Sequence, residues 1–167
     1  FLDNILKQFV FLKYLFILFC FLTIINGCNF IDGFNGLLII HSIIIILILL
    51  ILNFNNIYFN NLLILLVSIV IVLFLNFPKA KVFLGDSGAY LIGFILSVYT
   101  IKTSNYDLNI SPFFFCTLLF YLFFEVLFSF ARKKVMKQNP LFPDKNHMHM
   151  ILFRIINKKK YKDKIKA

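Results

Sequence analysis

Five long apolar segments limit the folds that this sequence can adopt. They lie at residues 9–25, 36–52, 59–75, 89–101 and 112–131. A helix needs about 20 apolar residues, and at least about 17, to cross a bilayer. Their length and lack of alternation favour spanning helices over strands, although the fourth is long enough only if residues 85–88 are embedded too. We predict an all-α, polytopic membrane helix bundle with about five transmembrane helices, in one integral-membrane domain over residues 1–167.

The composition supports a membrane environment. The chain is 61% hydrophobic and 14% charged, with a mean hydropathy of +0.91. Soluble domains are about 45–50% apolar and about 25% charged, so secreted, disordered and nucleic-acid-binding classes are excluded. The net charge of +10 does not indicate nucleic acid, because about a dozen of the 17 Lys and Arg residues lie from Arg132 onward. We therefore expect a basic cytoplasmic loop and tail over residues 132–167.

Positive charge also predicts which loops face the cytoplasm, because cytoplasmic loops are enriched in Lys and Arg. Five spans place loops 26–35 and 76–87 on the side of the basic tail. Loop 53–61, on the opposite side, has no Lys or Arg. The cytoplasmic side then receives acids from three separate loops, namely Asp32, Asp86 and Asp144.

The loops around Asp32 and Asp86 are rich in Gly and Asn. Glycine allows close backbone approach, while Asn and Asp supply oxygen ligands and turn hydrogen bonds. Asp86 stands where a span begins, and the positive end of a helix favours a carboxylate that is free to hold a hard cation. Two structural interpretations remain open: an ordinary polar turn at Asp32 and a helix cap at Asp86.

His147 and His149 follow Asp144 and Lys145 in the basic region. Histidines in this setting suit phosphate binding or acid–base chemistry. A zinc pair is an alternative, although no Cys and no further cytoplasmic His completes a tetrahedral set. A solvated interfacial loop is another alternative.

Two polar residues stand inside predicted spans. An acid within the bilayer usually faces the bundle interior, so Glu125 is expected to pair with a base such as Arg132 or to serve function. His41 is expected to be a satisfied polar residue within the bundle rather than a ligand.

Converging carboxylates, glycine turns, histidines and lysines suit a magnesium-bound diphosphate substrate. Mg²⁺ usually binds one or two carboxylates together with phosphate oxygens. Phosphoryl transfer needs mainly positioning and charge neutralisation from the protein. At a membrane face the expected nucleophile is a lipid phosphate.

Three stretches resemble, in the same order, motifs of the polyprenyl-phosphate N-acetylhexosamine-1-phosphate transferases. They are Asn29-Phe-Ile-Asp32-Gly33-Phe-Asn35-Gly36-Leu37, Val82-Phe83-Leu-Gly85-Asp86-Ser-Gly88 and Pro143-Asp144-Lys145-Asn146-His147-Met148-His149. The resemblance implies that UDP-N-acetylhexosamine and undecaprenyl phosphate give undecaprenyl-diphospho-sugar and UMP, with Mg²⁺ as cofactor. It also implies that this reaction starts a cell-envelope polysaccharide, such as O-antigen, at the cytoplasmic face of a bacterial inner membrane.

The same resemblance implies roles for individual residues. The catalytic residues would be Asp32, Asp86, His147 and His149, with Asp86 also the magnesium ligand. The substrate-binding residues would be Asn29, Gly33, Asn76, Phe83, Asp144, Lys145 and Arg132.

The sequence also departs from the family pattern. Asn35 stands where members often carry a second Asp, and Met150 stands where a third His is common. An adjacent acidic pair expected in an earlier loop is missing, as is a span after the His motif. We therefore expect a fragment of a larger bundle of about ten or eleven helices, inactive alone. The alternative is a small multispan transporter or accessory membrane protein with Glu125 and His41 as relay groups. A homodimer is left open.

Overall fold

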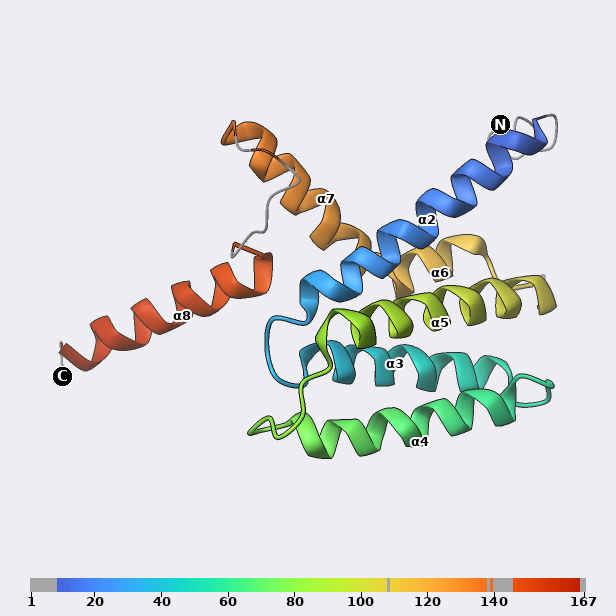
Figure 1. Cartoon of the computed structure of the whole chain (residues 1–167), viewed down its shortest axis with the longest axis horizontal. Coiled ribbons are helices and arrows are strands. Elements are labelled where there is room, and N and C mark those ends of the chain that lie inside the picture. The colour runs from blue at the N-terminus through green and yellow to red at the C-terminus, as the bar shows by residue number, and fades with distance from the viewer. Residues whose placement is uncertain (1–8, 108, 138, 140–145, 166–167) are drawn as a thin grey trace.

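The computed structural model describes residues 9–107, 109–137, 139 and 146–165, and in this part of the chain the regular structure is all helical, with no strand. The helices are α2 (Val10–Ile31), α3 (Leu37–Leu52), α4 (Phe59–Asn76), α5 (Gly85–Tyr106), α6 (Pro112–Leu118), α7 (Phe120–Val135) and α8 (Met148–Ile165), shown in Figure 1. The all-α class predicted from the apolar segments is confirmed.

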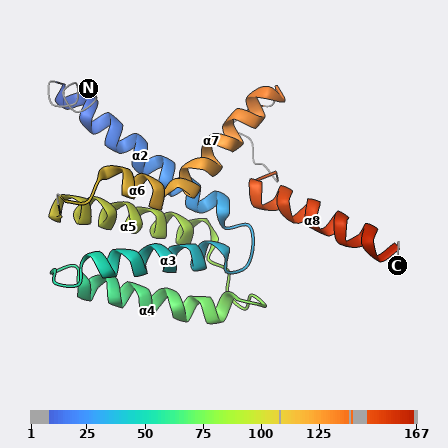
Figure 2. The same cartoon turned by 180° about the vertical axis from the view of Figure 1, so that it is seen from behind.

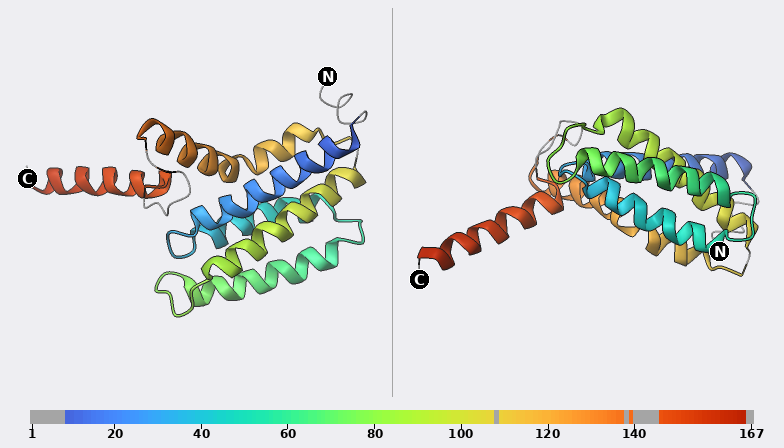
Figure 3. Two further views of the ribbon diagram at one scale, coloured as in Figure 1. Left: turned by 45° about the horizontal axis from the view of Figure 1, so that its top comes forward. Right: turned by 90° about the horizontal axis from the view of Figure 1, so that it is seen from below.

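The bundle is arranged around α2 and α5. Helices α3, α4 and α5 run side by side, and α2 crosses over α5 and also packs against α7 (Figures 1 and 2). The α2–α3 loop and the α4–α5 loop lie at the same end of the bundle, and we call this end the motif end. Helix α8 starts near the motif end and runs away from the bundle in both views of Figure 3.

The chain is a multi-pass membrane protein. Helices α2 and α4 are long and apolar enough to cross a membrane, and the α6–α7 pair adds a third candidate if it counts as one span. Helix α3 is apolar but has only 16 residues. Helix α5 runs from Gly85 to Tyr106, so the predicted 89–101 segment is extended at both ends to a helix of 22 residues. The count of five spans stays a prediction.

The segment predicted as one span over residues 112–131 is bent. Helices α6 and α7 meet at 63° around Leu119, which is buried. Neither Pro nor Gly stands at the break, although these are the common local causes of a kink. The bend therefore has no local Pro or Gly as its cause, and it directs α7 out of the line of α6 (Figure 2).

Two glycines bring α2 into close contact with its neighbours. A Cβ on Gly27 would lie 2.5 Å from the carbonyl oxygen of Leu122 in α7. A Cβ on Gly93 of α5 would lie 2.8 Å from the Cα of Ile25. Because lipid gives no hydrophobic drive for helix association, small residues at such contacts allow the close packing that replaces it.

A buried polar contact joins α3 to α5 at the opposite end of the bundle. Asn53, which is 0% exposed, donates hydrogen bonds to Leu49 O and to Thr103 Oγ1, both at 2.7 Å. Asn56 donates in turn to the side-chain oxygen of Asn53. This contact fixes the far ends of the two helices whose near ends carry the motif loops.

Candidate functional site

Asn76 ties the two motif loops together. This last residue of α4 accepts a hydrogen bond from Gly36 N at 2.6 Å and donates one to Val82 O at 2.8 Å. Gly36 has a φ of +78°, a left-handed conformation that glycine adopts without a steric penalty. The Asn76 side chain is 4% exposed, and both of these hydrogen bonds are with backbone atoms. The predicted substrate contact of Asn76 stays a prediction.

Asp32 and Asp86 come from different loops and lie close enough to interact. Asp32 is half-buried just after α2, whereas Asp86 is exposed in the first turn of α5. Burial raises the pKa of Asp32 to about 6, and the negative charge of Asp86 contributes to this rise. A cation beside Asp32 would offset the repulsion from the neighbouring negative charge.

The same pair fits a magnesium ion that is shared with a substrate. The described residues contain no group of three or more His, Cys, Asp or Glu side chains that could enclose a metal. Mg²⁺ needs fewer protein ligands than this, because it keeps waters or substrate phosphates as its remaining ligands. The donor set at Asp32 and Asp86 therefore suits Mg²⁺ with a phosphate substrate better than a protein-enclosed metal.

The two histidines of the third motif lie against the first motif. His147 packs on the Phe30 ring at 4.8 Å and His149 packs edge-on against Phe34 at 5.3 Å. A Cβ on Gly33 would lie 2.5 Å from His149 Nε2. Gly33 therefore leaves room for the imidazole, while its predicted substrate contact stays a prediction.

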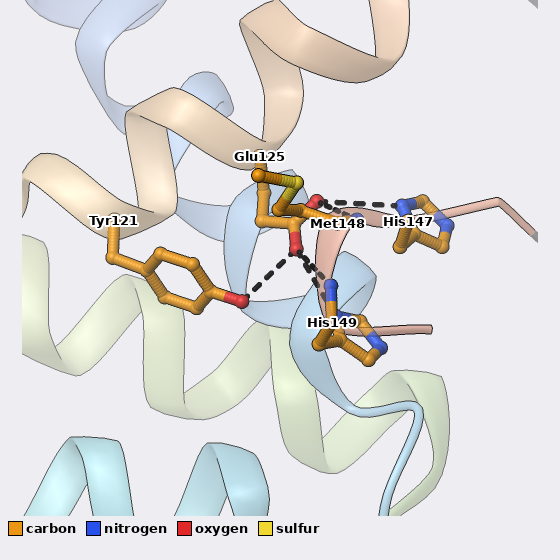
Figure 4. A network of polar contacts seen from close by, with 5 residues as sticks. All are labelled: Tyr121, Glu125, His147, Met148 and His149. Carbon is orange, nitrogen blue, oxygen red and sulfur yellow. Dashed lines mark hydrogen bonds and ion pairs between the residues drawn. The ribbon is translucent and has the colours of Figure 1, made fainter. Parts of the chain in front are cut away.

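Glu125 of α7 holds the histidine segment in place (Figure 4). Its Oε1 lies 3.0 Å from His149 Nδ1 and accepts a hydrogen bond from Tyr121 Oη at 3.0 Å. Its Oε2 accepts one from Met148 N at 3.2 Å and lies 3.8 Å from His147 Nδ1. The carboxylate is 0% exposed, and its hydrogen-bond donors replace the water that burial removes.

The two histidines differ in their surroundings. Both are more than nine-tenths buried, and their rings stack nearly parallel at 5.9 Å. Burial lowers the pKa of His147, an effect that outweighs the attraction of Glu125. At neutral pH His147 is therefore uncharged. His149 Nε2 has no hydrogen-bond partner among the described residues.

The remaining predicted site residues lie around this centre or outside the described part. Asn29 donates to Tyr90 Oη at 3.3 Å, which links α2 to α5 near Asp86. Phe83 is 75% exposed in the α4–α5 loop, and Arg132 is half-buried near the end of α7. Asp144 and Lys145 lie outside the described residues.

Sequence reasoning missed the partner of Glu125. The acid itself was visible as an ionisable residue within a span, but a base such as Arg132 was expected as its partner. The structure instead gives it His149 and the backbone of α8. Tyr121, one turn earlier on α7, carried no sequence signal beyond its i, i+4 spacing from Glu125.

The structure confirms one part of the expectation for His41 and contradicts another. Its ring meets Tyr121 edge-on at 5.7 Å, and Nε2 is buried with no hydrogen-bond partner among the described residues. Tyr121 uses its hydroxyl on Glu125 instead. His41 is therefore placed within the bundle as expected, but it is not a satisfied polar group.

The fold and the site define a multi-pass membrane protein with an acid- and histidine-containing centre at one end of its helices. The sequence model described as glycosyl transferase family 4 matches residues 1–104. This match covers more than half of the chain, so the chain belongs to glycosyl transferase family 4.

Three relatives carry names that specify a reaction. The undecaprenyl-phosphate alpha-N-acetylglucosaminyl 1-phosphate transferase of Thermotoga maritima is 36% identical over 143 residues, which are 86% of this chain and 44% of the relative. A protein of Bacillus subtilis named probable undecaprenyl-phosphate N-acetylglucosaminyl 1-phosphate transferase is 27% identical, over 75% of this chain and 36% of the relative. The decaprenyl-phosphate N-acetylglucosaminephosphotransferase of Mycolicibacterium smegmatis is 28% identical, over 80% of this chain and 38% of the relative.

The chain thus spans less than half the length of these relatives. No solved structure matches it significantly.

Proposed function

We propose that the protein containing this chain transfers N-acetylhexosamine 1-phosphate from a UDP-sugar to undecaprenyl phosphate or a related polyprenyl phosphate. The products would be the lipid-linked diphospho-sugar, which starts a cell-envelope polysaccharide, and UMP. One observation supports this most directly: segments far apart in sequence bring Asp32, Asp86 and His149 to one end of the bundle. The names of the relatives supply the acceptor lipid and the sugar phosphate.

The proposed reaction is a single phosphoryl displacement. An oxygen of the lipid phosphate attacks the phosphorus that carries the sugar, a new P–O bond forms, and the P–O bond to the UMP leaving group breaks. Such a reaction depends on alignment of the phosphates and on neutralisation of their charge. Asp32 would orient the diphosphate, and the histidine pair would contact phosphate or sugar-nucleotide oxygens.

Asp86 would hold Mg²⁺ in this scheme. The ion, when bound, would offset the negative charge of the phosphates. Asp86 suits this role because it is exposed at the first turn of α5 and lies close to Asp32. The exposed Phe83 and the Asn29 amide would border the nucleotide, with Arg132, Asp144 and Lys145 as further substrate contacts.

We also propose the membrane arrangement that the sequence predicts. Five spans from this chain, within a larger bundle of about ten or eleven helices, would cross a bacterial inner membrane. The motif end would face the cytoplasm, because Lys79, Lys81 and the basic region after Arg132 are on that side. Nucleotide sugars would then reach the site from the cytoplasm while the lipid phosphate approaches from the bilayer.

The test is UMP release by the full-length protein in detergent or nanodiscs. We expect release only when a UDP-N-acetylhexosamine, polyprenyl phosphate and Mg²⁺ are all present. Asp86→Asn should lower kcat/KM by about 100-fold or more, since charge stabilisation in phosphoryl transfer contributes on this scale.

Asp107→Asn is the matched control. Asp107 follows α5 at the opposite end of the bundle, where it accepts a hydrogen bond from Asn109 N. This substitution removes the same charge without touching the motif end, so its effect should stay within about threefold. Full activity of both Asp32→Asn and Asp86→Asn would overturn the proposed function and favour the transporter alternative.

A further inference from the structure

Glu125 is a buried acid to which neither the motifs nor the proposed reaction assigns a role. It lies on α7, is 0% exposed, and faces the start of α8 (Figure 4). Leaving a carboxylate in such a place without partners would cost several kcal/mol. The partners of the Glu125 carboxylate therefore indicate its role in the structure.

Two of these contacts are with the backbone of α8. Met148 N donates to Glu125 Oε2 at 3.2 Å, and His149 N donates to Oε1 at 3.4 Å. These are the first N–H groups of α8, which have no partners within their own helix. A negative charge at this position is also favoured by the helix dipole. Glu125 thus caps α8 from another helix, and it places the backbone of residues 148 and 149.

The third contact determines where a proton lies on His149. Its Nδ1 is 3.0 Å from Glu125 Oε1. Because Oε1 belongs to a carboxylate, which only accepts hydrogen bonds, the proton of this contact belongs on Nδ1. A neutral imidazole has one N–H, so Nε2 is left with its lone pair.

Nε2 of His149 is directed at the first motif. It is the atom that a Cβ on Gly33 would touch at 2.5 Å, and Asp32 is the residue before Gly33. Nε2 has no hydrogen-bond partner among the described residues, although the side chain is more than nine-tenths buried. Buried polar atoms are normally hydrogen-bonded, so this atom has an unused acceptor position beside the proposed diphosphate site.

We propose that Glu125 is a positioning residue, which keeps the His149 proton on Nδ1 and thereby presents the Nε2 lone pair to a hydrogen-bond donor of the bound substrate. Suitable donors are a hydroxyl, an amide N–H or a protonated phosphate oxygen. The part of this inference that concerns substrate rests on the proposed function, whereas the part that concerns the proton does not. Glu125 acts only through His149 and has no direct contact with the reacting atoms.

The experiment that tests the proton position is nitrogen NMR of the full-length protein labelled with ¹⁵N-histidine. Spectra are recorded without substrate at pH about 8.5, two units above the pKa of an ordinary histidine. A His149→Gln sample assigns the His149 signals. We expect a protonated Nδ1 and an unprotonated Nε2 in the wild-type protein. The opposite tautomer would overturn the proposal.

Glu125→Gln tests whether the carboxylate is the cause. An amide can either accept from Nδ1 or donate to it, so the preference for one tautomer should be lost and a protonated Nε2 should appear. We expect kcat to fall by about 100-fold, the scale of a misplaced acid–base group, with a much smaller change in KM. An unchanged tautomer in this variant would contradict the proposal, whatever its activity.

Glu125→Asp separates this role from a purely structural one. It keeps an acceptor-only carboxylate, so the proton should stay on Nδ1 and activity should return to within about tenfold of wild type. A folded Glu125→Asp protein with a protonated Nε2 would overturn the proposal even if Glu125→Gln fails to fold. If the protein releases no UMP under any condition, the proposed function fails, while the tautomer measurement still decides the role of Glu125.

Discussion

Gly33 and His149 are in direct steric contact across 116 residues of sequence: a Cβ at position 33 would lie 2.5 Å from Nε2 of the imidazole. The first motif therefore has a glycine where the third motif needs space. This contact leads to the first prediction, because a methyl group at position 33 would press on the ring and on the end of the Met150 side chain, whose Cε lies 2.7 Å away.

Gly33→Ala should lower activity by about 10- to 100-fold, because a displacement of about 1 Å in a catalytic group has effects of this size. UMP release measures this. The thermal stability of Gly33→Ala in His149→Ala and wild-type backgrounds checks the cause. If the two residues clash, the destabilisation seen in wild type should largely disappear in the His149→Ala background. Equal destabilisation in both backgrounds would contradict this explanation.

Asn76→Ala should loosen both motif loops. The change removes the acceptor for Gly36 N and the donor for Val82 O; the first of these contacts is buried, and an unsatisfied buried group costs about 1–3 kcal/mol. We expect a lower melting temperature and a raised KM for the nucleotide sugar. Asn61→Ala is the matched control, since Asn61 is an exposed residue near the other end of α4. Equal effects of the two substitutions would show that Asn76 has no special role.

Gly27→Ala should separate α2 from α7. The new methyl group would meet the Leu122 backbone at 2.5 Å, and backbone atoms cannot move aside as a side-chain end can. Overpacking of this kind costs about 1–3 kcal/mol, and it also shifts the helix that carries Glu125. Thermal unfolding and UMP release should therefore decline together. Leu18→Ala on the same helix is the control, because Leu18 is 53% exposed, and a stability loss as large as that of Gly27→Ala would contradict the packing argument.

The stability contribution of His147 should depend on pH. Burial lowers the pKa of this residue below its ordinary value of 6.5, so the unfolded chain takes up the proton more readily than the folded protein. As pH falls through about 6.5, the unfolded state is favoured and stability is lost; above this pH the effect vanishes.

Melting temperatures of wild type and His147→Asn between pH 8 and pH 5.5 measure this effect. The wild-type protein should lose more stability on acidification than the variant does, because only the wild type carries the buried imidazole. A difference between the two proteins that stays constant over this range would show that His147 is not held in its neutral form.

Much of this protein could be predicted from one-dimensional properties of its sequence. Hydropathy predicted helical segments near α2, α3, α4 and α5 with boundaries within a few residues, except that α5 runs from Gly85 to Tyr106 and α2 continues to Ile31. The order of the loops then placed Asp32 and Asp86 at one end, because consecutive spans alternate in direction. These are consequences of helix length and of the cost of burying polar groups, and both are local properties of the chain.

Only the tertiary structure decided which groups meet. The pairing of Glu125 with His149 joins residues 24 positions apart, on a helix whose direction is set by a bend at Leu119 that has no local Pro or Gly. The contact of Gly33 with His149 and the two bonds of Asn76 likewise depend on how helices pack. In Ile- and Phe-rich segments every face is apolar, so the sequence determined that the helices associate with lipid or with each other. Close packing at Gly27 and Gly93, which no hydropathy pattern encodes, determined the angles and hence the site.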